Sequence, residues 1–419
     1  MRRPFSRDAT SLGRSQSNKD VVNVQYRKKP ASMKKNSKSK NEQKNVKTKE
    51  PGEQKLFALK ALLEGNPEAG GRLTIGLDLG DRKNVWCALD AEGEVIARGE
   101  VINEKQPLEH FFSRIPIGLI ALEVGTHSPW ISRLLKKLGH EVIVANARQV
   151  KLISQSSKKN DRLDAEFLAR LARADRKLLA PIRHRGETAQ ADLVAVRVRA
   201  QLVELRTQAI SAARGLVKSF GQRLAACDAD SVRREHAQHL EPKIRPQVEK
   251  LLKIVEELTR EIADSDAELK KISAARYARE TEQLEQVKGV GPVTALTFVL
   301  TLDDAERFKR SRDVGCYVGL RPKSNQSGAS EPEMRISKEG DDYLRTLLVQ
   351  CAQYILSQRG PDTDLKRWGL EIAAKGKKKA KRRAVVAVAR KLAVLLHRLW
   401  VSGERYEPLR HRGPAAMAA

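Results

Sequence analysis

The sequence predicts a multidomain protein of the α/β plus α class. Between residues 73 and 174, short apolar strands alternate with helical segments, which is typical of a sheet covered by helices. Residues 187–220 and 241–285 are long helical segments with few breakers. From residue 284 onward the chain is mostly helical around a Gly-x-Gly turn. These three observations predict a sheet domain, a long helical insertion and a helical C-terminal domain.

Composition changes along the chain predict five regions. The first is rich in Lys, Arg, Ser and Asn and has little periodic apolar content, so we expect a disordered basic arm. An organelle transit peptide is the alternative, because the start is rich in Arg and Ser. The predicted regions are the arm (1–70), an α/β domain (71–183), a helical coiled-coil region (184–283), a C-terminal domain (284–406) and a tail (407–419).

The α/β domain has a recognisable order of elements. Three consecutive strands, joined by turns such as 81–84 and 91–93, precede alternating helices and strands. This is the order of a ribonuclease H-like domain. The predicted elements are strands 73–79, 84–90 and 94–101, helix 105–114, strand 117–122, helix 129–138, strand 141–145 and helix 161–174.

The charge of the chain indicates its partners. The formal net charge is +28 over 419 residues, with a pI near 10.1, and such a field attracts phosphate polymers. No apolar run reaches the roughly 20 residues of a spanning helix, so we expect a soluble, cytoplasmic protein with no membrane partner. The four cysteines match no zinc or redox spacing, so neither structural zinc nor disulfides are expected.

Four acidic residues form the most informative pattern. Asp78 ends one apolar strand, Glu123 ends another, and Asp161 and Asp164 begin a helix three residues apart. Oxygen ligands that converge from strand ends and a helix suit hard divalent cations. The sequence therefore predicts a metal site for phosphoryl transfer.

Each acid also has an ordinary structural interpretation. Asp161 can cap the helix and Asp164 can favour its first turn. However, both lie beside the stripe of Leu163, Phe167 and Leu171, which predicts that they face the domain. His127, in the loop after Glu123, is more typical of a hydrogen-bonding residue than of a ligand.

An apolar seam on the second long helix favours self-association. Its residues keep steps of three, four or seven and are flanked by charges, so we expect a coiled coil that dimerises the protein. A hairpin within one chain is the alternative. The seam residues are Val248, Leu252, Val255, Leu258, Ile262 and Leu269.

The C-terminal domain begins with a helix-hairpin-helix signature. Gly289 and Gly291 flank one apolar residue, and Lys288 precedes them. Such glycines let a tight turn press backbone N–H groups against a DNA phosphate, although Gly-x-Gly also ends ordinary helices.

A polar loop follows, in which Ser327 is bordered by the cations Lys323, Arg335 and Lys338. This setting can hold a phosphate, but composition alone favours an ordinary loop serine. Three neighbouring serines are not ranked by sequence chemistry: Ser324, Ser330 and Ser337. The basic run 375–383 is expected to form a solvated or phosphate-facing surface rather than to select bases. The further cations expected to bind nucleic acid are Arg345, Lys377, Lys378, Lys379, Lys381, Arg382 and Arg383.

Together these motifs resemble the DEDD transposases of bacterial insertion sequences, which are serine-using, bridge-RNA-guided recombinases with a RuvC-like N-terminal domain. The resemblance covers about residues 72–406. It rests on Ile75-Gly-Leu-Asp78, Ala121-Leu-Glu123, Lys159-Asn-Asp161-Arg-Leu-Asp164, Val287-Lys-Gly-Val-Gly-Pro292, Gln326-Ser327-Gly328 and Arg335-Ile-Ser-Lys-Glu-Gly-Asp-Asp-Tyr-Leu-Arg345.

The resemblance implies a function for these residues. Asp78, Glu123, Asp161 and Asp164 would be catalytic ligands of Mg²⁺ or Mn²⁺, and Ser327 would be the nucleophile. The implied partners are donor and target DNA, a guide RNA and further copies of the chain in a dimer or tetramer, at the bacterial nucleoid. A metal-dependent nuclease for branched DNA and a non-enzymatic nucleic-acid-binding protein are the alternatives.

Overall fold

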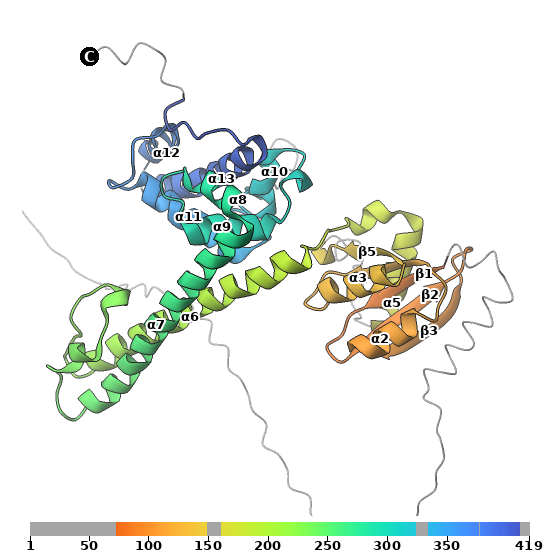
Figure 1. Ribbon diagram of the computed structural model, residues 1–419, viewed down its shortest axis with the longest axis horizontal. Helices are drawn as coiled ribbons and strands as arrows, with labels where there is room; N and C mark the ends of the chain where they lie inside the picture. The colour runs from red at the N-terminus through yellow and green to blue at the C-terminus, as the bar shows by residue number, and fades with distance from the viewer. Residues whose placement is uncertain (1–72, 149–160, 324–333, 377, 411–419) are drawn as a thin grey trace, which may run out of the picture. The chain divides into compact units, whose positions relative to one another are not determined.

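The computed structural model describes residues 73–148, 161–323, 334–376 and 378–410. Its first part is α/β and the rest is helical (Figure 1). No helix in these ranges is long and apolar enough to cross a bilayer. The predicted α/β plus α class is therefore confirmed at this level, and the predicted basic arm lies outside the described residues.

The α/β part contains a five-stranded mixed sheet in the order β3-β2-β1-β4-β5. The first three strands are antiparallel, and β4 and β5 continue the sheet parallel to β1. This arrangement is consistent with a ribonuclease H-like domain. The strands are β1 (Thr74–Asp78), β2 (Lys83–Leu89), β3 (Val95–Ile102), β4 (Leu119–Glu123) and β5 (Glu141–Ala145).

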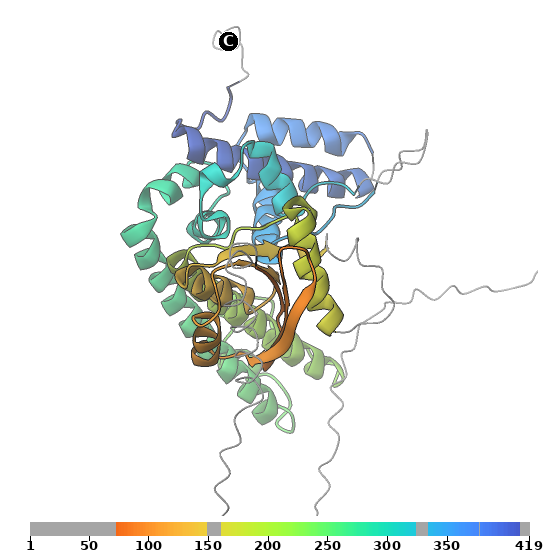
Figure 2. The same ribbon diagram turned by 90° about the vertical axis from the view of Figure 1, so that its right-hand side faces the viewer.

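Helices cover both faces of this sheet (Figure 2). Alternation along β1 sends Ile75 and Leu77 to the face covered by α2 (Lys105–Phe112) and α3 (Ser128–Lys137). The other face is covered by α5 (Asp161–Ala174), whose buried small residues contact β1 and β2. A short 3-10 turn, η2 (Arg176–Leu179), follows α5. The sheet edge at the end of β1 therefore meets the start of α5.

Two long helices form an antiparallel hairpin within the chain. They are α6 (Glu187–Lys218) and α7 (Arg245–Arg276), joined through the 3-10 turns η3 (Ala229–Ser231) and η4 (Arg234–Ala237). Leu252 and Val255 are fully buried, and they pack against Ile210 and Val217 of α6. The expectation that this seam dimerises the protein is therefore corrected, because the seam is already covered by α6 of the same chain. The internal hairpin was the alternative.

The predicted helix 241–285 also breaks near its end. Tyr277 leaves the helical conformation, with φ −135° and ψ 20°, and α8 (Ala278–Glu285) begins after it. The hydroxyl of Tyr277 donates a hydrogen bond to Asp192 of α6 at 2.8 Å. The break therefore separates the hairpin from the C-terminal helices.

The C-terminal helices share one hydrophobic core. Leu284 of α8, Phe298 of α9, Leu348 of α11 and Leu392 of α13 are buried in it. The elements are α9 (Pro292–Leu302), the 3-10 turn η5 (Ala305–Arg307), α10 (Ser311–Tyr317), α11 (Asp342–Leu356), α12 (Asp364–Ala374) and α13 (Lys378–Ser402).

The buried seam makes a stability prediction. Leu252→Ala should lower the free energy of unfolding by about 2–5 kcal/mol, because it removes a fully buried side chain from the α6–α7 packing. Ile254→Ala on the same helix is the control. Ile254 is 46% exposed, so its loss should change stability by only about 0.5 kcal/mol. Urea denaturation would measure both. If Leu252→Ala reduced the mass in solution without changing stability, the seam would belong to an interface between copies.

Candidate active site

The candidate site is built on the end of β1. Gly76 and Asp78 lie on the strand face that α5 covers, because Ile75 and Leu77 are buried on the other face. A Cβ at Gly76 would overlap the carbonyl oxygen of Ala165 and lie 2.7 Å from the amide nitrogen of Ala169. Only glycine therefore lets the backbone of α5 rest directly on the strand, which brings the first turn of the helix to Asp78.

Three of the four predicted acids meet at this point. Carboxylate oxygens of Asp78, Asp161 and Asp164 all lie within 4.8 Å of one another. Asp161 is exposed and the other two are half-buried, so the group faces solvent on one side. The chemistry of three carboxylates fits a hard divalent cation, and these residues could hold one.

Glu123 lies on the neighbouring strand. Leu122 pairs with Leu77 in the parallel register of β4 and β1, so Glu123 follows beside Asp78. It also shares a strand face with Ala121, which packs against α5. The group of three carboxylates within 4.8 Å does not include Glu123. The structure thus places Glu123 on the strand beside Asp78, outside the group of three carboxylates.

The helical stripe predicted beside these acids is partly wrong. Leu163 is 51% exposed, whereas Leu171 is buried and Phe167 packs against the same cluster. The buried face of α5 is formed instead by Ala165, Leu168, Ala169, Leu171 and Ala172. Small residues therefore set the distance between helix and sheet.

His127 has the hydrogen-bonding role expected for it. Its Nδ1 accepts a hydrogen bond from Trp130 Nε1 at 3.3 Å, and its Nε2 lies 3.6 Å from a carboxylate oxygen of Asp81. It immediately precedes α3 and does not belong to the group of three carboxylates. The loop after Glu123 is thereby tied to the loop after Asp78.

Ser327 lies outside the described residues, as do Ser324, Ser330 and Lys377, but the base of the loop is described. Pro322 and Ile336 form an antiparallel bridge, and the amide of Lys323 donates to the carbonyl of Arg335 at 2.9 Å. The amide of Lys338 donates to the carbonyl of Gly319 at 3.0 Å. The two ends of the serine loop are therefore held together.

Cations surround this base. Lys323, Arg335 and Lys338 are all exposed, as expected for side chains that meet a phosphate. Gly319 has φ +73°, and a Cβ there would lie 2.5 Å from the amide nitrogen of Glu339. The backbone segments thus approach too closely for any side chain at Gly319.

Arg345 corrects one predicted nucleic-acid contact. It is only 9% exposed and donates to the carbonyl oxygens of Val318 at 3.0 Å and Glu339 at 3.4 Å. Its guanidinium also pairs with Asp342. Burial lowers the pKa of the Arg345 guanidinium from its ordinary value, and the nearby Asp341 opposes this shift. Arg345 therefore fastens the loop base to α11 and does not face a phosphate.

Comparisons with known proteins agree with this architecture. A family profile described as Transposase IS116/IS110/IS902 family matches residues 281–366, and a second profile, for DEDD transposases of the IS110 type, matches residues 75–221. A putative transposase of Sinorhizobium fredii is 28% identical over 356 residues, which cover 83% of this chain and 89% of the relative. The transposase for insertion sequence element IS1111A of Coxiella burnetii is 28% identical over 342 residues, or 79% and 90% of the two chains. The chain belongs to the IS116/IS110/IS902 transposase family.

The family assignment makes this transposase an enzyme that cuts and rejoins DNA. A probable family 20 transposase of Pseudomonas aeruginosa is a further relative, 28% identical over 300 residues that cover 70% of this chain and 87% of the relative. The carboxylate group lies within the matched residues 75–221, and the described base of the serine loop lies within the matched residues 281–366.

The other predicted contacts of the transposase are at its surface. Lys288 and Gly291 are exposed at the turn between α8 and α9, and Gly289 has φ +103°. This turn joins two helices, and its contact with DNA remains a prediction. The described cations at the start of α13 are also exposed: Lys378, Lys379, Lys381, Arg382 and Arg383.

Sequence reasoning missed the residues that position the three carboxylates. Gly76 lies two residues before Asp78 on the same strand face, and Ala165 and Ala169 lie four apart on α5. The available signal was a glycine inside an apolar strand, which often marks a close backbone approach. The sequence did not show that α5 is the helix whose backbone approaches Gly76.

The contact between α5 and β1 predicts the effect of adding one methyl group at Gly76. Gly76→Ala should push α5 from β1 and lower the affinity for Mn²⁺ by about tenfold or more, while the fold is retained. Gly215→Ala on α6 is the control, because a Cβ there meets nothing within 4 Å. Electron paramagnetic resonance would measure bound Mn²⁺, and circular dichroism would measure folding. Equal Mn²⁺ affinity in the two variants would refute the role of Gly76.

Proposed function

We propose that this transposase cuts and rejoins DNA through a serine–DNA linkage, with Ser327 as nucleophile and with Mg²⁺ or Mn²⁺ held by Asp78, Asp161 and Asp164, beside Glu123. The carboxylate group at the end of β1 carries the metal part of the proposal. Like charges held this close favour binding of a cation that neutralises them. A divalent cation there would stabilise negative charge on phosphate oxygens.

The serine part rests on the resemblance and on the chemistry of the loop base. Attack by the Ser327 hydroxyl would form an O–P bond as a sugar–oxygen–phosphorus bond breaks. The serine loses its proton and the leaving sugar oxygen gains one. One phosphodiester is exchanged for another, so a sugar hydroxyl can reverse the step and rejoin a strand. Lys323, Arg335 and Lys338 would stabilise charge on the phosphate.

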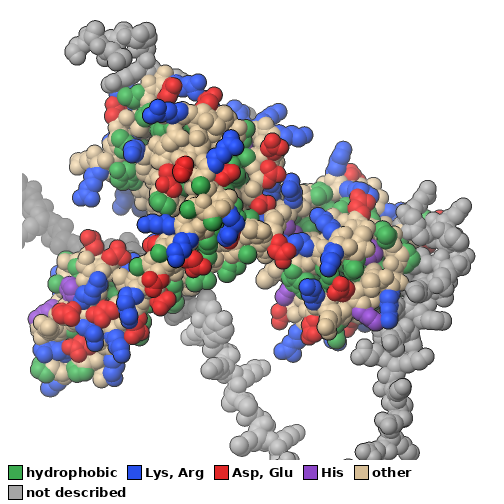
Figure 3. Space-filling view, viewed as in Figure 1, with side chains coloured by type: hydrophobic (Ala, Val, Ile, Leu, Met, Phe, Trp, Pro, Cys, Tyr) green, Lys and Arg blue, Asp and Glu red, His purple; other side chains and the backbone are tan. Residues whose placement is uncertain are grey.

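The start of α13 supports nucleic-acid binding. It carries Lys378, Lys379, Lys381 and Arg382, and its first turn has no acidic residue. Cations at a helix N-terminus oppose the helix dipole, so a bound polyanion would relieve this repulsion. On the face shown in Figure 3, acidic and basic side chains are otherwise intermixed.

The proposal includes an element-encoded guide RNA and an assembly of two or four copies, as the resemblance implies. Pairing of the RNA with donor and target DNA would then choose the sequence, and the protein would supply the chemistry. An assembly would make cutting depend on the presence of all the subunits. Both parts are expectations that mass measurement and RNA copurification can test.

The metal centre predicts the phenotype of Asp161. Asp161→Asn should reduce Mg²⁺-dependent DNA cleavage by more than the roughly 10–100-fold that loss of an outer partner costs. Stability should change little, because Asp161 is exposed. Asp264→Asn, at an exposed position of α7, is the control and should cleave normally. A large loss of stability in Asp161→Asn, seen by thermal denaturation, would favour a structural capping role.

The nucleophile predicts a covalent adduct. Wild-type protein incubated with Mg²⁺, substrate DNA and its cognate RNA should form a protein–DNA band that survives denaturing electrophoresis. Ser327→Ala should bind nucleic acid but form no adduct, and Ser211→Ala, at an exposed position of α6, should form it normally. An adduct that persists in Ser327→Ala would assign the attack to Ser324 or Ser330. Cleavage by the wild type without any adduct would indicate a metal-dependent nuclease.

A further inference from the structure

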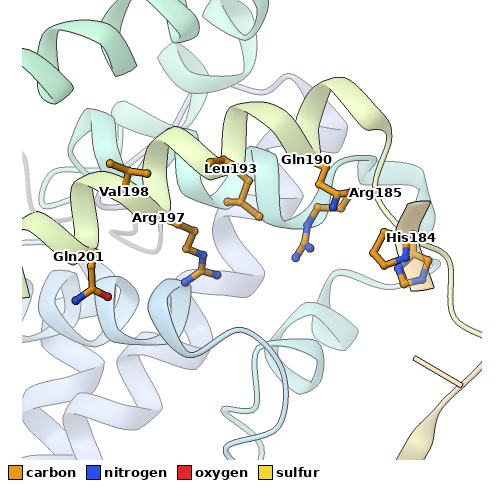
Figure 4. A pocket seen from close by; sticks show the side chains of 9 residues that line it. His184, Arg185, Gln190, Leu193, Arg197, Val198 and Gln201 are labelled. Carbon is orange, nitrogen blue, oxygen red and sulfur yellow. The ribbon is translucent and has the colours of Figure 1, made fainter. Parts of the chain in front are cut away.

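A groove runs along one face of α6 and has no assigned role. Its volume is about 410 Å³, in the range of ligand pockets. Gln190, Val194, Val198 and Gln201 recur at helical spacing along its wall, and Arg185 lies at one end. Figure 4 shows Arg185 and Arg197 extending on the same side of the helix.

The groove combines an apolar wall with cations. Val194 is 58% exposed and Val198 is 51% exposed, one helical turn apart. Single exposed valines are common on protein surfaces, so these two alone indicate nothing. Arg185 and Arg197 argue against an apolar protein surface as the partner of this groove. Such a surface, placed on the valines, would also remove the two guanidinium groups from water.

His184 also lines the groove, and its pKa reflects the local electrostatic potential. Burial, followed by the charges of the neighbouring cations Arg133, Lys136, Arg185 and Arg307, lowers the pKa of His184 to about 4. Its Nε2 lies 3.0 Å from the hydroxyl of Ser128. The imidazole is therefore neutral at physiological pH, in a region of positive potential that would attract an anion.

Both arginines retain donors for such an anion. Arg185 uses Nε to donate to the carbonyl of Thr301 at 3.0 Å. Arg197 pairs with Asp341, and its guanidinium also lies 5.4 Å from the ring centre of Tyr343. A guanidinium has five N–H donors, so each can hold its internal partner and still face the groove.

We propose that this groove binds a strand of substrate DNA, with phosphates beside Arg185 and Arg197 and sugar faces against Val194 and Val198. The choice of DNA as the ligand rests on the transposase activity and on the position of the groove near the base of the serine loop. Asp341, the partner of Arg197, is the N-cap of α11 and comes immediately after the loop base that ends at Gly340. A strand held in the groove would therefore pass the described base of the loop to which the proposed nucleophile belongs. The inference rests on the proposed function in this respect.

The test uses matched substitutions on the full-length protein. Val198→Glu should weaken binding of a fluorescein-labelled single-stranded DNA oligonucleotide by about tenfold more than Leu216→Glu, measured by anisotropy. Both residues are exposed on α6, and both changes alter the net charge equally. They lie about 27 Å apart along the helix, at 1.5 Å per residue. Gln201→Glu should likewise weaken binding more than Gln247→Glu on α7, since both glutamines are exposed.

Titration of His184 would test directly whether DNA occupies the groove. Bound phosphate should raise the pKa of His184 in wild-type protein, because an anion offsets part of the field from Arg133, Lys136, Arg185 and Arg307 and so favours the imidazolium. Nuclear magnetic resonance of labelled histidines would follow the shift as oligonucleotide is added. An unchanged His184 pKa at saturation would place the DNA elsewhere.

Three results would overturn the assignment. Equal losses in the matched variants would show only a general charge effect. A Val198→Glu defect confined to an RNA of the same sequence would assign the groove to RNA. A lowered mass in solution with normal DNA affinity would assign it to another copy of the chain. In each case wild-type DNA cleavage would leave the proposed function standing, whereas wild-type protein that neither bound nor cut DNA would remove both.

Discussion

The arrangement of the three carboxylates depends on direct contact between the backbones of α5 and β1. Gly76 has no space for a side chain against Ala165 and Ala169, so the helix lies as close to the strand as chain geometry allows. The ion pair between Glu166 and Arg98 of β3 also ties α5 to the sheet, whereas the pair between Glu166 and Arg170 lies within α5. Such partly exposed pairs contribute roughly 0–1 kcal/mol each. Close packing, which a single methyl group would disrupt, therefore sets the separation of the carboxylates.

The base of the serine loop is built on the same principle. Gly319 and Gly340 both have positive φ, and each lies against the backbone of the opposite segment. Arg345 then joins the carbonyl oxygens of both segments from beneath. In both places a close backbone contact supports the side chains of a proposed site, which are the carboxylates beside β1 and the cations of the loop base. Rigid support matters because catalytic groups act only within a narrow range of positions.

The sequence predicted the sheet well because alternation and strand-ending acids are local signals, and observed strand ends differ from the predicted ones by at most two residues. The sequence-based prediction failed where the role of a residue depends on which other segment it contacts. The period of the α7 seam identifies a buried face, but both a second copy and α6 can cover that face. Arg345 has the charge of a phosphate contact, yet its partners are buried carbonyls. Leu163 lies at the edge of a stripe that shifts by about 40° every four residues, so its exposure was not fixed by spacing.

Ion pairs of nearly buried carboxylates join α6 to the end of α7 and to the C-terminal helices. Asp192 accepts hydrogen bonds from Arg276 and Tyr277 at the end of α7, and Arg197 holds Asp341 at the start of α11. Asp192 and Asp341 are nearly buried, so the loss of either arginine would leave a carboxylate without its charge partner, which costs more than the pair contributes. These pairs oppose rotation of α6 about its axis. The groove along α6 is therefore held in a fixed orientation to the segment that follows the serine loop, which a docked DNA strand requires.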